Sequence, residues 1–172
     1  MPDGLYDHDA LAWADQQATL LRRLASGEGV NEAVDWPNVI EEVQDVGLLE
    51  LRACQSLLEQ VLTHLLKLHA LPDSGSAKHW RDEVRAFRHD MQRRFTPSMR
   101  QRIGLDDLYD KAAGRARAAM EDNGIVPLPL PQACPFALDD LLAERLDVAA
   151  LVAKLNITYP DAPGRARNPT RE

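Results

Sequence analysis

One long helical pattern constrains this chain more than any other feature. Apolar residues recur at steps of three and four between residues 39 and 68, which places them on one side of a helix. Pro72 ends the helix, and Gly47 inside it marks either a bend or a close helix crossing. This side is formed by Val39, Ile40, Val43, Val46, Cys54, Leu57, Leu58, Val61, Leu65 and Leu68. We therefore expect one central helix against which other helices pack.

Patterns of the same period predict helices before and after it. The first begins at the cap signal Asp7–Asp9 and ends near Ser26 and Gly27. A second predicted helix contains the apolar stripe from Trp80 to Phe95. A third runs from Thr96 to Gly124 with a break at Gly104, and a last helical region after Pro135 is split at Asp147. The strand pattern of alternating polar and apolar residues is missing. The prediction is an all-α antiparallel bundle of about four main helices with a short C-terminal helical extension.

The composition predicts one globular domain over residues 1–157 and a flexible tail over 158–172. A chain of 172 residues with 45% hydrophobic residues can bury a core without disulfides. Cys54 and Cys134 form no C-x-x-C motif; we expect Cys54 to be an inert buried thiol and Cys134 to be the more reactive one. The sequence has neither a signal-peptide pattern nor an apolar run long enough to span a membrane, so we expect a cytoplasmic protein.

Several short motifs occur together in a characteristic order. They are Leu5-Tyr6-Asp7 with Trp13 and Gln17, Asp35 with Val39-Ile40-Glu41-Glu42-Val43, His64-Leu65-Leu66-Lys67, Trp80-Arg81, and Cys134-Pro135-Phe136. In this the chain resembles the domain of unknown function family twenty-nine, a bacterial family, over roughly residues 5–146. The resemblance implies an all-helical fold and brings no established activity, so it assigns no catalytic residue.

Glu41, Glu42 and His64 are the candidate catalytic residues. His64 shares a helix face with Leu57, Val61 and Leu68, and a carboxylate partner would make its imidazole a base or a ligand. In one straight helix, however, Glu42 and His64 would lie about 33 Å apart, so a site within one chain requires a break in the helix. The alternative is a buried, hydrogen-bonded structural histidine. The sequence has no Glu-x-x-His pair, and neither a metal nor another cofactor is predicted.

The helix that follows Pro72 is basic. Arg81, Arg85 and Arg88 lie at helical spacing beside the Trp80 stripe and are the candidate binding residues, since guanidinium groups bind carboxylates and phosphates at two points. The alternative is that these arginines pair with the acidic segment that contains Glu41 and Glu42, or remain solvated. A net charge of −7 disfavours nucleic acid as a partner.

Common catalytic motifs are missing from the sequence, which favours a protein that is not an enzyme. The leading hypothesis is a noncatalytic helical module in the bacterial cytosol that binds a protein partner or forms a homodimer. Two alternatives stay open: a metal-assisted or acid-base enzyme that uses Glu41, Glu42 and His64, and a regulator that associates with nucleic acid through the basic helix.

Overall fold

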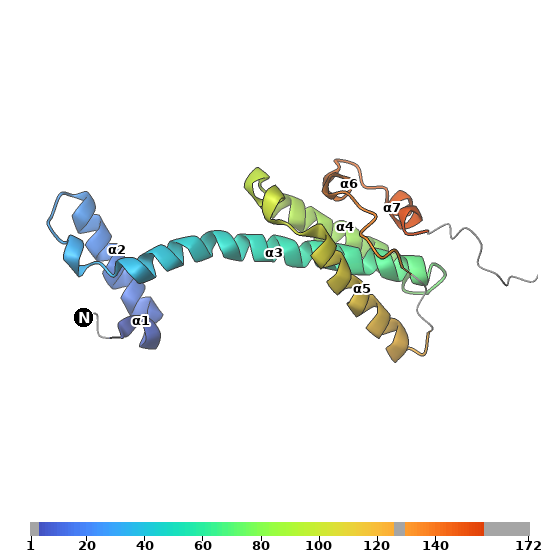
Figure 1. Cartoon of the computed structure of the whole chain (residues 1–172), viewed down its shortest axis with the longest axis horizontal. Helices are drawn as coiled ribbons and strands as arrows, with labels where there is room; N and C mark the ends of the chain where they lie inside the picture. The colour runs from blue at the N-terminus through green and yellow to red at the C-terminus, as the bar shows by residue number, and fades with distance from the viewer. Residues whose placement is uncertain (1–3, 126–129, 157–172) are drawn as a thin grey trace, which may run out of the picture. The chain divides into compact units, whose positions relative to one another are not determined.

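A computed structural model describes residues 4–125 and 130–156 of the chain (Figure 1). Every regular element in these ranges is a helix, which confirms the predicted all-α fold. None of these helices is both long and apolar enough to cross a bilayer. The predicted tail 158–172 lies outside the described residues, as do Pro127 and Pro129 of the proline-rich connector.

Seven α-helices and two short 3-10 helices make up the described part of the chain. In order they are α1 (Leu5–His8), α2 (Ala10–Ala25), η1 (Asn31–Ala33), α3 (Trp36–Ala70), α4 (Ala77–Arg94), η2 (Pro97–Arg102), α5 (Leu105–Asp122), α6 (Leu138–Leu142) and α7 (Val148–Lys154). They divide into two compact units, unit 1 (Met1–Arg52) and unit 2 (Ala53–Glu172). The single domain expected over residues 1–157 stays a prediction.

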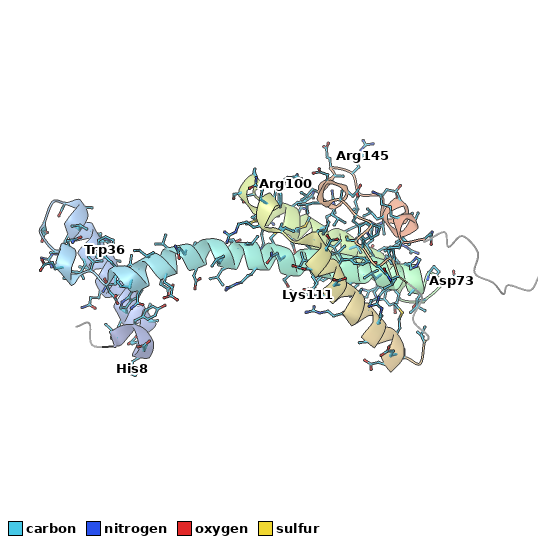
Figure 2. All side chains as sticks on the ribbon, in the orientation of Figure 1. His8, Trp36, Asp73, Arg100, Lys111 and Arg145 are labelled. Atoms are coloured by element: carbon cyan, nitrogen blue, oxygen red, sulfur yellow. The ribbon has the colours of Figure 1, made fainter. Side chains whose placement is uncertain are left out.

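Unit 1 is built around Trp13. Its helix α2 begins at Asp9, whose carboxylate accepts a hydrogen bond of 3.0 Å from the Ala12 amide and so satisfies a free donor of the first turn. Trp13 packs with Val34 and Val39 in the core, and its indole Nε1 donates to Asp35 Oδ2 at 3.1 Å. Figure 2 shows Trp36 at the start of α3, where it borders the same core. Trp13 is therefore a packing residue.

Helix α3 is helical at every residue and continues through Gly47, but its two parts differ in burial. From Leu51 onward the predicted apolar side is buried, and Cys54, Leu58, Val61 and Leu65 are fully covered. Before Leu51 the same side is different. Ile40, Val43 and Val46 are exposed, because the core of unit 1 reaches α3 at Trp36 and Val39 in its first turn.

Unit 2 contains most of the core. Helix α4 buries Val84 and Met91, and Gly104 separates η2 from α5, at the break that the sequence predicts. Gly124 has a φ of 68°, a left-handed conformation that glycine adopts without strain, and it ends α5 as predicted. The Tyr109 hydroxyl donates to the Pro131 carbonyl at 3.1 Å and ties α5 to the segment that leads into α6.

The C-terminal extension consists of two short helices, as predicted. Asp147 caps α7 by accepting a hydrogen bond of 3.0 Å from the Ala150 amide, so it separates α7 from α6. Lys154 Nζ lies 2.6 Å from Asp140 Oδ2 and links the two helices again. Arg100, labelled in Figure 2, pairs with Asp139 of α6 at 2.7 Å. The first ion pair therefore joins the two helices of the extension, and the second connects α6 to η2.

Candidate functional site

His64 lies in unit 2 with both ring nitrogens engaged. Its Nε2 is 2.7 Å from Glu83 Oε2 on α4, and its Nδ1 is 2.8 Å from the Gln60 carbonyl oxygen. The side chain is only 8% exposed, and Phe87 packs on the ring with a centroid distance of 5.6 Å. An imidazole held at both nitrogens is positioned as a structural link between α3 and α4. Glu83 was not singled out in the sequence. The one local signal for an ion pair at Glu83 was its spacing of four residues from His79, whose Nε2 lies 3.3 Å from the same Glu83 oxygen.

Glu41 and Glu42 lie in unit 1. The Tyr6 hydroxyl donates to Glu42 Oε1 at 2.8 Å, and this hydrogen bond, with the surrounding carboxylates, raises the pKa of Tyr6 to about 12. Both glutamates are exposed. An acid-base site shared by Glu41, Glu42 and His64 stays a prediction. Within residues 4–125 and 130–156, no three His, Cys, Asp or Glu side chains are placed to hold a metal ion.

The three candidate binding arginines lie in different surroundings. Arg88 is buried, and its Nε donates to the Leu141 carbonyl at 3.0 Å, at the end of α6. Gln92 donates to the next carbonyl, that of Leu142, at 3.0 Å. Both side chains satisfy backbone oxygens that a helix C-terminus leaves free, so they fasten α6 to α4. Arg81 and Arg85, by contrast, are exposed.

Arg81 and Arg85 line a cavity of about 600 Å³ in unit 2. Its other walls come from the end of α3, the loop after it, and α7 with the residues on either side: Leu68, Pro72, Leu146, Asp147, Val148, Ala149, Val152, Ala153 and Asn156. The lining thus combines two arginines with several apolar side chains. The sequence indicated the arginines but not the α7 residues, because α7 is too short for its apolar positions to show which helix they meet.

A second surface is the exposed α3 segment, residues 40–50 of unit 1. Val43 is 70% exposed and Val46 is 66% exposed, and Ile40 and Leu49 are exposed as well. The segment holds four acidic residues and no basic one: Glu41, Glu42, Asp45 and Glu50. The sequence placed Ile40, Val43 and Val46 on one side of a central helix and did not show that this side is exposed. Exposed apolar residues gathered on one element are typical of interaction surfaces.

The two cysteines are poorly suited to nucleophilic chemistry. Cys54 is fully buried, as expected, and burial raises the pKa of its thiol. Burial also raises the pKa of the Cys134 thiol. A free cysteine is already mostly protonated at neutral pH, and a raised pKa lowers the thiolate fraction further. Cys134 is half-buried and Cys54 is fully buried, so the expectation that Cys134 is the more reactive of the two stays a prediction.

Comparisons with known proteins support the helical fold. The chain is similar to an α-helical protein of unknown function from Rhodospirillum rubrum ATCC 11170, whose crystal structure superimposes with a TM-score of 0.69 at 30% sequence identity. The likeness covers 87% of this chain and 96% of the other. A search of curated proteins gave no match. The family model described as Domain of unknown function DUF29 matches residues 5–146, so the chain belongs to the DUF29 family.

Proposed function

We propose that this protein is a noncatalytic protein-interaction module that binds a basic amphipathic helix of a partner protein along the exposed α3 segment. The observation that carries the proposal is the exposure of Ile40, Val43, Val46 and Leu49 on one stretch of helix. Val43 and Val46 are three residues apart and therefore neighbours on one helix face, and a helix buries such a pair by laying it against the apolar face of another helix. Burying one valine side chain contributes about 1.5 kcal/mol, so a few such residues support measurable affinity.

The charge of the segment defines the partner. Glu41, Glu42 and Asp45 lie in a stretch without a lysine or arginine, and these carboxylates attract a partner with basic flanks and repel an acidic one. A second copy of this chain that used the same segment would bring acidic residues against acidic residues. We therefore favour a different, basic protein over the homodimer, and sedimentation analysis of the purified protein at low salt should show a monomer.

Gly47 lies within the segment and permits close approach. A Cβ atom added to it would meet no heavy atom within 4 Å, so the space beside it is open. Glycine in an exposed helix interior costs about 1 kcal/mol relative to alanine. A partner helix that packs closely at this position would offset that cost.

The test uses fluorescence anisotropy with a labelled peptide of about 18 residues, a Leu/Lys sequence that forms an amphipathic helix of about five turns. We expect binding that weakens as salt is raised, because exposed charges are screened. The Val43→Ser, Val46→Ser double variant should bind at least about tenfold more weakly. Both residues are exposed and serine has a helix propensity close to that of valine, so the variant keeps its fold, which circular dichroism verifies.

The matched control is the Val43→Ile, Val46→Ile variant, which retains the apolar stripe and should bind as the wild type does. A Leu/Glu peptide of the same length is the charge control and should not bind. Equal affinity for the acidic and basic peptides, or unchanged affinity in the serine variant, would refute the proposal. Sedimentation of the wild type as a dimer that the serine variant abolishes would assign the segment to a second copy instead.

A further inference from the structure

The cavity beside α4 lies in unit 2 and does not share a residue with the exposed α3 segment. We infer that it is a binding site for a small aliphatic carboxylate, with the carboxylate held by Arg81 and Arg85 and the hydrocarbon chain against α7. This site is independent of the proposed binding of a partner helix. The inference rests on the size of the cavity, on the pair of guanidinium groups and on the charge of the lining.

The size and walls fit a small ligand with an apolar body. A volume of about 600 Å³ lies within the range of roughly 300–1,000 Å³ that small-molecule sites occupy. Leu68 and Val148 are buried side chains whose surfaces form part of the wall, and Val152 is half-buried beside them. A hydrocarbon chain placed there would replace water against an apolar surface.

The arginine pair fits a carboxylate. Arg81 and Arg85 are four residues apart on α4 and therefore neighbours on one helix face. Arg85 Nη1 is 3.0 Å from Asp82 Oδ1, which holds one guanidinium beside the cavity, while Arg81 makes no ion pair with a described residue. Guanidinium groups bind the two oxygens of a carboxylate with parallel hydrogen bonds.

The charge of the lining selects a monoanion. Two arginines and one carboxylate, that of Asp147, leave the lining with one net positive charge. Asp147 is also occupied, since its Oδ1 accepts the hydrogen bond from the Ala150 amide that caps α7. A carboxylate carries one negative charge. A phosphate monoester carries about 1.5 to 2 negative charges at neutral pH, which is more than the net positive charge of the lining. The site therefore favours a carboxylate over a phosphate.

Isothermal titration calorimetry of the full-length protein with sodium octanoate tests the inference. We expect octanoate to bind with a stoichiometry of one, and octanamide, which has the same chain without the charge, to bind about tenfold or more weakly. The Arg81→Gln, Arg85→Gln variant should lose about tenfold to hundredfold in octanoate affinity and should no longer distinguish octanoate from octanamide. Octyl phosphate should bind more weakly than octanoate.

Two further variants complete the design. Arg22→Gln, Arg93→Gln removes the same charge from exposed positions outside the cavity lining and should bind octanoate as the wild type does. Val152→Ser makes the wall more polar. It should weaken the binding of octanoate while leaving the ratio of the octanoate and octanamide affinities unchanged. Absence of octanoate binding at millimolar concentration, equal binding of octanamide, or an equal loss in the Arg22, Arg93 control would overturn the inference. A negative result in the α3 peptide experiment would not affect the inference of a carboxylate site, because that experiment probes residues of unit 1.

Discussion

His64 Nε2 lies 2.7 Å from Glu83 Oε2, and this pair links α3 to α4. The other ring nitrogen faces the Gln60 carbonyl, so both neighbours of the imidazole are hydrogen-bond acceptors. Each ring nitrogen therefore has a partner, one on α3 and one on α4. The histidine that the sequence offered as a catalytic candidate is thereby placed in a structural contact with a residue of the next helix.

Replacing Glu83 should destabilise the fold through this contact. We expect Glu83→Gln to lower the free energy of unfolding by about 1–3 kcal/mol, because it weakens a hydrogen bond to a charged group at a buried ring. Urea denaturation followed by circular dichroism measures the change. Glu121→Gln, at an exposed position of α5, is the control and should stay within about 0.5 kcal/mol of the wild type. Equal stability of Glu83→Gln and the wild type would show that the pair has no structural role.

The hydrogen bond from Tyr6 to Glu42 predicts a dependence on alkaline pH. The folded pKa of Tyr6 is raised to about 12 from an ordinary value near 10, so the stability that this bond contributes is complete below pH 10 and is lost as pH rises from 10 to 12. Because Tyr109 also has a pKa of about 12, spectroscopic titration of tyrosinate is done in the Tyr109→Phe, Tyr159→Phe variant, in which Tyr6 is the one remaining tyrosine.

In that background, Glu42→Gln should lower the Tyr6 midpoint toward 10, because it removes the strongest acceptor and one negative charge. Glu32→Gln, an exposed change elsewhere in unit 1, should leave the midpoint where it is. A Tyr6 midpoint near 10 in the wild type would contradict the contact.

Arg88 should tolerate an apolar replacement of similar length better than truncation. Burial lowers the pKa of its guanidinium, and Nη2 is buried without a hydrogen-bond partner among the described residues. Arg88→Met removes that unsatisfied donor along with the bond to Leu141, so we expect a change of only about 1 kcal/mol. Arg88→Ala should cost about 2–4 kcal/mol, because it also leaves a cavity under α6. Thermal and urea unfolding of both variants would check this, and equal losses would show that the charge itself stabilises the fold.

Truncation to alanine should lower the free energy of unfolding in the buried part of α3 and leave it nearly unchanged in the exposed part. Leu58 is fully buried, so Leu58→Ala should cost about 2–5 kcal/mol. Val43 is mostly exposed, so Val43→Ala should change stability by less than about 0.5 kcal/mol. Urea denaturation of the two variants measures both effects. A loss at Val43 similar to that at Leu58 would mean that residues 40–50 are covered in solution by the chain itself or by a second copy.

Much of the helical architecture could be predicted because its signals are local. The break at Gly104, the left-handed stop at Gly124 and the cap at Asp147 each depend on the conformation of one residue and its immediate neighbours. Helix α1 was missed because a four-residue helix has too few positions to show a period. The exposure of Val43 was missed for a different reason: periodicity shows which residues share a face and carries no information on what covers that face.

The candidate sites could be predicted only in part. Arg81 and Arg85 were found because their spacing on one helix is visible in the sequence, whereas the wall formed by α7 depends on how distant segments pack. Arg88 has the same spacing and the same chemistry as Arg85, yet it is buried under α6 while Arg85 is exposed. The difference comes from α6, some fifty residues further along the chain, and no local pattern encodes it.

The difference in burial between the two parts of α3 also determines where the helix unfolds locally. Backbone amides in residues 40–50 are protected from water by hydrogen bonds within the helix, without the packed side chains that shield the amides around Leu58. Local fraying of such a stretch needs little free energy, so its amides should exchange hydrogen sooner than those further along the same helix. Arg52 lies just beyond it, exposed, at the end of unit 1. Brief exposure to trypsin should therefore cut the chain there first.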